Sequence, residues 1–472
     1  MFLSIDKKDP RKTAAIDSAG RKCTYGDLVC FSRDLRKMIP GRELVMVLSQ
    51  NDIPTLFLYL GCMINRIVPI LIGNTMEKDA IKNLIEKYKP AYIAGQKELL
   101  EELKFEGGIS LWEKEETILV HNTEERPVLY PELSLLLTTS GSTGSPKLVR
   151  HSYDNIEKQA GNIAAFFEMD GTERPMVDLP IMYTYGLSIV NSHLYAGATV
   201  LLSTESIMNK SFWTFFRENG ATSFTGVPYS YELLKRLRFF HMDLPSLNML
   251  SQGGGKLPEE LQKEFAGYIM EKGGKYYATY GQTEGSARMA YLPPELALEK
   301  CGSIGKAIPN GCLYLMDEHG KRICQPGVQG EMYYEGPNVT LGYAENAKDL
   351  AKGDERNGIL ATGDIAYFDG DGCFYIVGRM KRFLKLYGYR VSLDECEMII
   401  RSKYAVDCAC TGNDRKLYIC LTDQELEAEI REFLLSKTGL YAMAVETRIV
   451  DGIPKNPAGK TLYQTLNEKI GV

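Results

Sequence analysis

The chain has 472 residues, of which 44% are hydrophobic and 25% are charged, so it is long enough for several folded units and too apolar to be disordered. Its formal net charge of -6 argues against a dedicated nucleic-acid-binding protein, because binding a phosphate backbone requires a basic surface. No run of about 18 apolar residues occurs and the N-terminus does not read as a secretory signal, so we expect no membrane span and a cytoplasmic location.

The 11 cysteines are scattered along the chain and odd in number. The closest pair, Cys408 and Cys410, is separated by one residue, and no CxxC motif occurs. With only five histidines in the sequence, this pattern predicts neither a zinc site nor a disulfide framework. We expect free thiols in a reducing compartment.

Apolar strands alternate with helical segments through the first part of the chain. The predicted strands are 44–48, 67–72 and 91–94. The predicted helices are 53–64, a segment capped by Thr75 that runs to Tyr88, and a later helix from Pro258 to Gly273. Such alternation is typical of βαβ units, so we expect sheets with helices on their faces.

After about residue 300, glycine and proline become frequent. Residues 369–372, Asp-Gly-Asp-Gly, lie between two apolar segments and predict a β-hairpin. They do not predict a calcium loop, because Cys373 stands at the fifth position, where an EF-hand loop needs an oxygen ligand. The last ~90 residues predict a small separate unit. Its expected elements are a helix capped by Ser392, a strand at 416–421 and a helix over 424–440.

The most informative segment follows an apolar strand at 135–137. It contains small and hydroxylated residues and ends in a lysine, and its candidate phosphate-binding residues are Thr139, Ser140, Gly141, Ser142, Thr143, Gly144 and Lys147. Glycines let backbone N–H groups turn toward an anion, hydroxyls add donors, and the lysine adds a positive charge. The segment is not a Walker A loop, because the spacing from Gly144 to Lys147 differs and no Ser or Thr follows the lysine.

Residues 139–147 resemble the phosphate loop of the adenylate-forming (AMP-binding) enzymes. This superfamily includes acyl-CoA synthetases, aryl-acid ligases, peptide-synthetase adenylation domains and luciferases. Four further segments resemble the family's motifs in the family's order: YGQTE at 280–284, TGD at 362–364, GRMKR at 378–382 and PKNPAGK at 454–460. The resemblance covers nearly the whole chain, and five motifs in order at suitable spacing are specific.

The resemblance implies a nucleotide site for ATP and Mg2+. Its implied adenine residues are Gly254, Gly255, Lys256 and Tyr280, and its implied ribose residues are Asp364 and Arg379. Tyrosine offers a flat face to a purine, and an ionised aspartate can accept from both hydroxyls of a ribose. Thr283 offers a hydroxyl to a phosphate oxygen, and Glu284 offers the hard oxygen ligand that suits Mg2+.

The resemblance also implies roles at the reacting carboxylate. Thr283, Glu284 and Lys460 are the implied catalytic residues, with Lys460 serving the first half-reaction. Attack of a carboxylate on a phosphate brings two anions together, and a preorganised cation lowers that cost. The implied acyl pocket consists of Tyr183, Thr184 and Gly281, and Arg382 is the implied hinge residue.

Four of these positions depart from the family's usual residues. Tyr183 replaces a histidine and cannot become cationic near neutral pH. Thr184 stands where relatives that activate amino acids carry an aspartate, which disfavours an α-amino acid substrate. Lys256 replaces a proline in the adenine strip, and Arg382 stands where many relatives have Asp or Lys.

The resemblance therefore implies an α/β adenylate-forming fold. We expect a large N-terminal α/β domain of packed sheets and helices over 1–381, and a small mobile α+β C-terminal domain over 382–472 that carries the lysine loop. The implied reaction joins a carboxylic acid to ATP, releases pyrophosphate, and passes the acyl group to CoA or a carrier-protein phosphopantetheine. Two alternatives stay open: a stand-alone amino- or hydroxy-acid–carrier protein ligase, and a catalytically silent nucleotide-binding protein.

Overall fold

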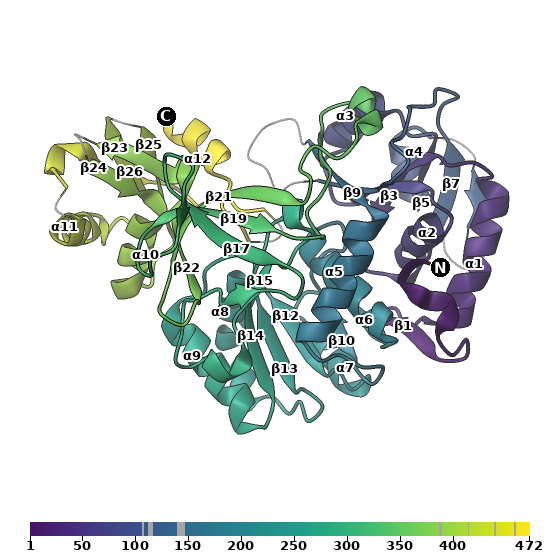
Figure 1. Cartoon of the computed structure of the whole chain (residues 1–472), viewed down its shortest axis with the longest axis horizontal. Coiled ribbons are helices and arrows are strands. Elements are labelled where there is room, and N and C mark those ends of the chain that lie inside the picture. Colours follow the sequence, from purple (N-terminus) through teal and green to yellow (C-terminus); the bar gives the residue numbers. More distant parts are fainter. Residues whose placement is uncertain are drawn as a thin grey trace.

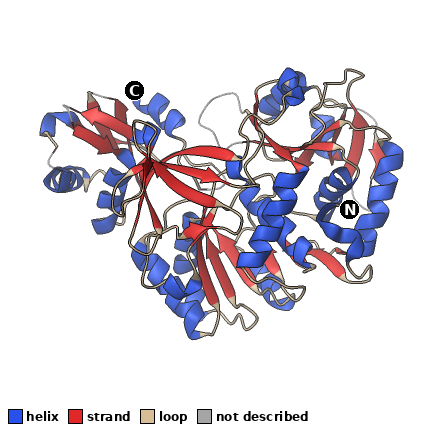
Figure 2. Ribbon diagram, viewed as in Figure 1, coloured by secondary structure: helices blue, strands red, loops and turns tan. Residues whose placement is uncertain are grey.

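The structure is a computed structural model of the chain, and it describes residues 1–105, 108–111, 117–138, 147–386, 389–413, 415–438, 440–456 and 459–472. Figures 1 and 2 show two large sheets with a layer of helices around and between them, and a smaller group of elements at the C-terminal end. Across the described ranges, no helix combines the length and apolar character needed to cross a membrane.

The first large sheet has eight described strands in the order β20-β9-β8-β4-β3-β5-β7-β6. They are β3 (Leu44–Ser49), β4 (Val68–Gly73), β5 (Tyr92–Gln96), β6 (Ile109–Ser110), β7 (Thr117–His121), β8 (Leu133–Thr138), β9 (Leu148–Ser152) and β20 (Gly342–Ala344). The central strands β8, β4, β3 and β5 run parallel. Alternate residues of β3 enter two different core clusters, so both faces are buried, which explains its uninterrupted apolar sequence.

The second large sheet has nine described strands in the order β16-β15-β14-β13-β12-β10-β11-β1-β2. They are β1 (Thr13–Asp17), β2 (Lys22–Thr24), β10 (Pro175–Val177), β11 (Val200–Leu202), β12 (Ser223–Gly226), β13 (Met249–Gln252), β14 (Lys275–Tyr280), β15 (Ala290–Tyr291) and β16 (Lys306–Ala307). The six strands from β14 to β1 pair in parallel, so their carboxyl ends lie along one edge.

Helices bury the faces of both sheets. The helices of this region are α1 (Tyr25–Met38), α2 (Ile53–Ile64), α3 (Lys78–Tyr88), α4 (Lys97–Glu102), α5 (Tyr153–Phe166), α6 (Thr184–Ala196), α7 (Lys210–Glu218), α8 (Pro228–Arg236) and α9 (Glu259–Glu271). Apolar residues of α1, α2, α5 and α6 share one core with both sheets. Residues of α3 and α4 cover the other face of the first sheet, and α7, α8 and α9 cover the other face of the second.

A third, antiparallel sheet follows in the chain, in the order β18-β17-β19-β21-β22. Its strands are β17 (Cys312–Met316), β18 (Arg322–Ile323), β19 (Gly330–Glu335), β21 (Ile359–Phe368) and β22 (Phe374–Arg379). Strands β21 and β22 form the hairpin predicted around residues 369–372. The TGD segment therefore lies inside β21, and the GRMKR segment begins at the end of β22.

The C-terminal elements form their own apolar core. They are β23 (Phe383–Leu386), β24 (Tyr389–Ser392), α10 (Leu393–Lys403), β25 (Cys408–Asn413), β26 (Lys416–Leu421), α11 (Glu427–Thr438), β27 (Val445–Ile449) and α12 (Tyr463–Ile470). Their main cluster contains only residues between Leu384 and Val445. Such a self-contained core is compatible with a domain over 382–472, whose boundary and mobility stay predictions.

Most of the elements predicted from the sequence occur where expected. Asp52 caps α2 through a bond from the Thr55 backbone N–H at 2.9 Å, and the Ser392 side chain caps α10. The predicted cap at Thr75 is wrong, because α3 begins at Lys78 after Glu77, whose side chain makes no capping bond. The predicted helix over 424–440 is shorter and spans Glu427–Thr438.

Candidate active site

Two neighbouring parallel strands of the second large sheet end in the segments predicted to bind adenine. Strand β13 ends at Gln252 and leads into Gly254 and Gly255, and β14 ends at Tyr280. Gly254 has a φ of +79°, a backbone conformation that favours glycine, and the Gln252 amide Nε2 donates to the Gly255 carbonyl at 2.6 Å. The carboxyl edge of an open parallel sheet is a usual place for ligands. Lys256 follows with an exposed side chain.

Gly281 lies where the backbone approaches itself too closely for any side chain. A Cβ atom at this position would lie 1.2 Å from the Ala287 carbonyl oxygen. The turn after β14 can therefore form only with glycine, and it brings Thr283 and Glu284 back toward the carboxyl edge of the sheet.

The two predicted ribose residues and the predicted adenine tyrosine lie together. The Asp364 side chain is 2% exposed; Tyr280 Oη donates to its Oδ2 at 2.5 Å, and Arg379 Nε lies 3.1 Å from its Oδ1. Burial, and after it the Asp364 charge, raises the pKa of Tyr280 well above its usual value. Gln282, which the sequence did not single out, donates to the same Oδ2 at 2.9 Å. Asp364 is thus held in place by three side chains, those of Tyr280, Gln282 and Arg379.

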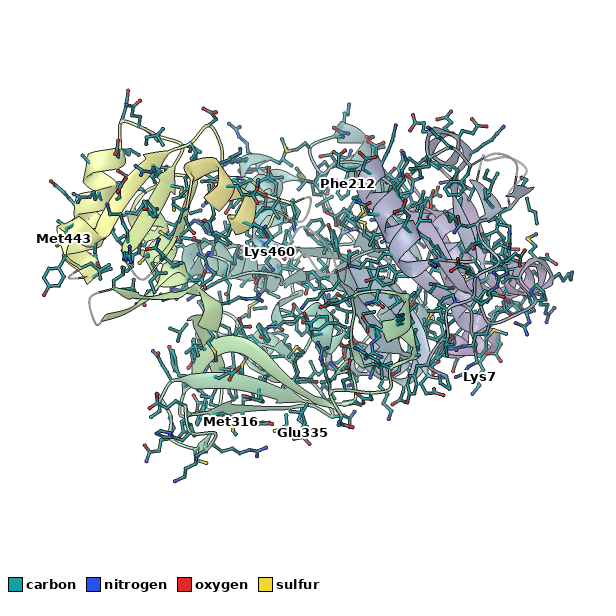
Figure 3. The ribbon with its side chains drawn as sticks, turned by 90° about the horizontal axis from the view of Figure 1, so that it is seen from above. Lys7, Phe212, Met316, Glu335, Met443 and Lys460 are labelled. Carbon is teal, nitrogen blue, oxygen red and sulfur yellow. The ribbon has the colours of Figure 1, made fainter. Side chains whose placement is uncertain are left out.

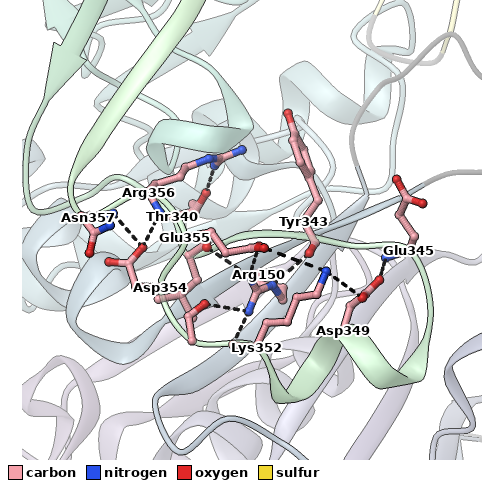
Figure 4. Close-up of polar contacts among 12 residues, drawn as sticks. Arg150, Thr340, Tyr343, Glu345, Asp349, Lys352, Asp354, Glu355, Arg356 and Asn357 are labelled. Carbon is pink, nitrogen blue, oxygen red and sulfur yellow. Dashed lines mark hydrogen bonds and ion pairs between the residues drawn. The ribbon is translucent and has the colours of Figure 1, made fainter.

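The Glu284 carboxylate lies beside an aromatic ring flanked by cations. Tyr343 donates through its hydroxyl to Glu284 Oε1 at 2.6 Å. Lys147 Nζ lies 3.9 Å from the centroid of the Tyr343 ring, and the Arg356 guanidinium carbon lies 4.7 Å from it. Thr340 donates through both its backbone N–H and its hydroxyl to the Glu284 carbonyl at 3.0 Å. Figure 4 labels Tyr343, Thr340 and Arg356 among the polar contacts of this region.

These residues fit a magnesium ion that is held mainly by a substrate. Within the described residues, no group of three or more His, Cys, Asp or Glu side chains is arranged to hold a metal. Protein sites for Mg2+ in nucleotide-using enzymes typically supply one or two carboxylates, with phosphate oxygens and water completing the shell. Glu284, which is partly exposed, supplies one such carboxylate.

The predicted acyl-pocket residues lie at the start of α6, against the turn that carries Thr283. Thr184 donates through its hydroxyl to Thr283 Oγ1 at 3.0 Å. Tyr183 is the N-terminal cap residue of α6, and burial raises the pKa of its hydroxyl, so this hydroxyl stays protonated at neutral pH. Tyr185 Oη lies 3.3 Å from Thr279 Oγ1. The first turn of α6 therefore borders the candidate site.

Lys460 comes from the C-terminal elements and lies near the residues predicted to bind the nucleotide. Its surface is accessible to solvent, yet enough protein surrounds it that burial, followed by the charge of Arg379, lowers the pKa of Lys460. Three carboxylates act in the opposite direction, those of Glu284, Asp364 and Asp394. Figure 3 labels Lys460 at the place where the C-terminal elements (yellow) meet the remainder of the molecule.

The loop that carries Lys460 packs against the second sheet's helices. A Cβ atom at Gly459, which has a φ of +73°, would lie 2.9 Å from the Tyr229 Cβ at the start of α8. Asn456 closes the loop, because its Oδ1 accepts from the Lys460 backbone N–H at 2.9 Å. Of this loop, Gly459 therefore lies against α8, and Asn456 fixes the backbone at Lys460.

The predicted hinge residue is bound to the C-terminal elements. The Arg382 side chain is 14% exposed; its Nε lies 2.5 Å from Asp394 Oδ1, and its Nη2 lies 2.7 Å from Glu397 Oε1. Its guanidinium carbon also lies 3.6 Å from the centroid of the Tyr463 ring. Asp394 also accepts from the Arg379 backbone N–H at 3.0 Å, so it holds both ends of the GRMKR segment.

Residues Thr139, Ser140, Gly141, Ser142, Thr143 and Gly144 of the predicted phosphate loop lie outside the described residues. Lys147, which ends this segment, lies at the Tyr343 ring, as described above. The sequence reasoning missed Gln282, Tyr343 and Arg356. Gln282 stands inside a recognised motif and could have been found, whereas no local pattern connects residue 343 with residue 284.

The chain matches the model of the family described as "AMP-binding enzyme" over residues 4–344. Because this match covers more than half of the chain, the protein belongs to the AMP-binding enzyme family. The expected family and the expected α/β fold are confirmed.

The individual proteins to which the chain is similar share only a low sequence identity with it. The chain is 27% identical to a 2-succinylbenzoate–CoA ligase of Bacillus subtilis, in an alignment covering 71% of this chain and 68% of the relative. It is 28% identical to an oxalate–CoA ligase of Arabidopsis thaliana over 69% of this chain and 65% of the relative. Among solved structures, it is similar to the O-succinylbenzoate coenzyme A synthetase of Bacillus subtilis in complex with ATP and magnesium, with a TM-score of 0.78, 21% identity and coverage of 99% and 98% of the two chains.

Proposed function

We propose that this enzyme is an AMP-forming acid–thiol ligase. In the first half-reaction a carboxylate oxygen attacks the α-phosphorus of ATP, the bond to the pyrophosphate breaks, and an acyl-adenylate forms. In the second, a thiol sulfur attacks the acyl carbon, the bond to AMP breaks, and the thiol proton leaves to solvent. The products are a thioester, AMP and pyrophosphate.

The observation that carries this proposal is the position of Lys460. A lysine from the C-terminal elements lies within electrostatic reach of Glu284, Asp364 and Arg379, which come from three separate segments of the chain. A cation at this point offsets the repulsion between a carboxylate and a phosphate. We assign Lys460 to the first half-reaction for this reason.

The other residues take roles that their contacts support. Asp364, held by Tyr280 and Arg379, would accept the ribose hydroxyls. Glu284, oriented by the Tyr343 hydroxyl, would hold Mg2+, which supplies charge neutralisation for the phosphates when bound. Thr283 would donate its hydroxyl to a phosphate oxygen. ATP and magnesium as cofactors are further supported by the solved relative that contains both.

Coenzyme A is the acceptor that we favour over a carrier protein. Both curated relatives described above are named as CoA ligases. Thr184, in place of the aspartate expected for amino-acid substrates, gives no carboxylate to hold an α-ammonium group, which argues against the amino-acid–carrier protein alternative. The intact set of Glu284, Asp364 and Lys460 argues against a catalytically silent nucleotide-binding protein.

Exchange of labelled pyrophosphate into ATP tests this proposal. The purified chain, with Mg2+, is incubated with pools of carboxylic acids in the absence of a thiol, and we expect acid-dependent exchange. Thioester formation is then compared between free CoA and a holo carrier protein. If ATP binds but none of the acid pools gives exchange, the chain is a silent nucleotide-binding protein. If the thioester forms only with the carrier protein, the enzyme is a carrier-loading ligase.

A further inference from the structure

Among the described residues, two arginine side chains are almost fully buried, and their surroundings differ. Arg150 is 0% exposed and has a carboxylate partner, because its Nη2 pairs with Glu355 Oε2 at 2.5 Å. Carbonyl oxygens of the neighbouring loop accept from the remaining guanidinium nitrogens of Arg150, including those of Tyr343 at 3.0 Å and Gly353 at 3.1 Å. Figure 4 shows this closed network. The Arg150 charge is compensated within the protein.

Arg288 is 1% exposed and has no such partner. Its Nη1 donates to the Ser188 hydroxyl at 2.8 Å, and its guanidinium carbon lies 4.8 Å and 5.1 Å from the ring centroids of Tyr185 and Phe167. Among the described residues, no carboxylate forms an ion pair with Arg288, and its buried Nε has no hydrogen-bond partner. A buried charge without a counter-ion is costly, so Arg288 requires an explanation.

Further buried polar atoms beside Arg288 are also unpaired. The Gln159 amide nitrogen donates to the Arg288 carbonyl at 2.5 Å, whereas its Oε1 has no partner in the described structure. His193 Nε2 likewise has no partner there. Burial lowers the pKa of His193 to about 3; the bond to the Ile189 carbonyl opposes this shift and the Arg288 charge adds to it, so His193 is neutral at neutral pH. Buried polar groups in native proteins normally have partners, and unpaired ones mark places where water or a ligand binds.

The position of Arg288 joins it to the candidate acyl pocket. Thr184, the first residue of α6, bonds Thr283 of the nucleotide turn, and the next residue, Tyr185, lies against Arg288. Ser188, which bonds Arg288, lies one helical turn further along α6. The two contacts lie one helical turn apart along α6, a rise of about 5.4 Å, so Arg288 lies near the place where Thr283 would meet a reacting carboxylate.

We propose that the acid substrate carries a second anionic group, a carboxylate, which pairs with Arg288. The guanidinium fork binds a carboxylate through two parallel hydrogen bonds, and the flat faces of Tyr185 and Phe167 hold it in one orientation. The spacing of one helical turn indicates a compact dicarboxylic acid. This inference rests on the proposed ligase function and specifies its substrate class.

The test compares matched acids on the full-length enzyme. Short dicarboxylic acids from malonate to adipate, together with the benzenedicarboxylic acids, are each paired with the corresponding monoamide, which has the same shape but lacks the second charge. We expect pyrophosphate exchange to prefer a diacid over its monoamide by a factor on the order of 10² or more, because a site built for an anion leaves its own polar group unpaired with the neutral analogue.

Variants at Arg288 separate recognition from structure. Arg288→Met should abolish the preference for the diacid, and Arg288→Lys should keep part of this preference. Arg288→Met should also melt at the same temperature as the wild type or at a higher one, because it removes an uncompensated buried charge. The preferred diacid should raise the melting temperature of the wild type and not that of Arg288→Met. Arg150→Met is the matched control: it removes a paired buried arginine, so it should lower stability and leave the diacid-to-monoamide ratio unchanged.

The possible results of these experiments separate a structural role of Arg288 from a failure of the ligase proposal. Arg288 would be structural, with the ligase function unaffected, in either of two cases. In the first, the enzyme uses monoamides as efficiently as diacids. In the second, Arg288→Met keeps the diacid-to-monoamide ratio of the wild type and melts at a lower temperature. Absence of exchange with both series, while another pool of carboxylic acids gives exchange, would overturn this inference and leave the ligase function standing. Absence of exchange with every acid pool would overturn both.

Discussion

Replacing Lys460 by alanine tests whether the two half-reactions use different residues. The Lys460 ammonium lies among three carboxylates and one guanidinium, in a position shielded enough to lower its pKa. At an effective dielectric constant of about 20, two unit charges about 4 Å apart interact by about 4 kcal/mol. Part of this gain is offset by the desolvation of the lysine, so we expect Lys460→Ala to slow adenylate formation by about 10²- to 10³-fold.

The assay measures the half-reactions separately. Pyrophosphate exchange reports adenylate formation, and conversion of a synthetic acyl-adenylate to the thioester reports the second step, which we expect Lys460→Ala to retain. Lys455→Ala is the control from the same loop: Lys455 pairs with Asp407 at 2.8 Å in a partly exposed position, so its loss should change either rate only slightly. Equal losses in both half-reactions would refute the assignment of Lys460 to the first.

Three further predictions concern the nucleotide, the hinge and pH. Asp364→Ala should weaken ATP and AMP binding by about 1.5–3 kcal/mol in calorimetry, the scale of a hydrogen bond to a charged group, and an unchanged affinity would make Asp364 purely structural. Arg382→Pro should retain pyrophosphate exchange and lose thioester formation, because proline fixes the φ angle of the backbone. Arg382→Ala loses the same ion pairs but should keep both activities. Circular dichroism checks that both variants fold, and identical activities of the two variants would contradict a need for backbone rotation. Burial lowers the pKa of His151 and of His193 from 6.5 to about 3. Below about pH 6.5 these histidines bind protons in the unfolded chain but not in the folded chain. The free energy of unfolding should therefore fall as the pH drops below about 6.5, by about 1.4 kcal/mol per pH unit for each histidine. Burial also raises the pKa of Asp178, to about 7, and of Glu397, and these two groups act in the opposite direction. Denaturant titrations between pH 4 and 7 should therefore show a smaller rise of stability with pH when either histidine is replaced by glutamine than in the wild type, and identical slopes would contradict the burial of the histidines.

Local elements were predictable from the sequence where one physical cause dominates. Strand β3 is buried on both faces, so its composition alone identifies it. The start of α2 carries both a capping aspartate and a proline in its first turn. The start of α3 carries no side-chain cap, which is why the expected position at Thr75 was wrong.

Parts of the candidate site could not be predicted because they depend on contacts between distant segments. Tyr343 and Glu284 are 59 residues apart in the sequence and meet only because β20 joins the edge of the first sheet. Arginine is exposed in most proteins, so no sequence pattern indicates that Arg150 and Arg288 are buried. Residues in recognised motifs were named in advance, whereas those that orient them emerge from the tertiary structure.

The bonds of Arg379 have a consequence for the energetics of any reorientation of the C-terminal elements. Its side chain pairs with Asp364 of the third sheet, and its backbone N–H bonds Asp394, which belongs to α10. Asp364 and Arg379 lie on the paired strands β21 and β22, so turning 382–472 away breaks the bond to Asp394 and leaves the ion pair in place. The bond that breaks is one hydrogen bond to a charged group, which contributes about 1.5–3 kcal/mol. The two orientations can then lie close enough in free energy for thermal motion to populate both, so that the bound ligand decides which one predominates.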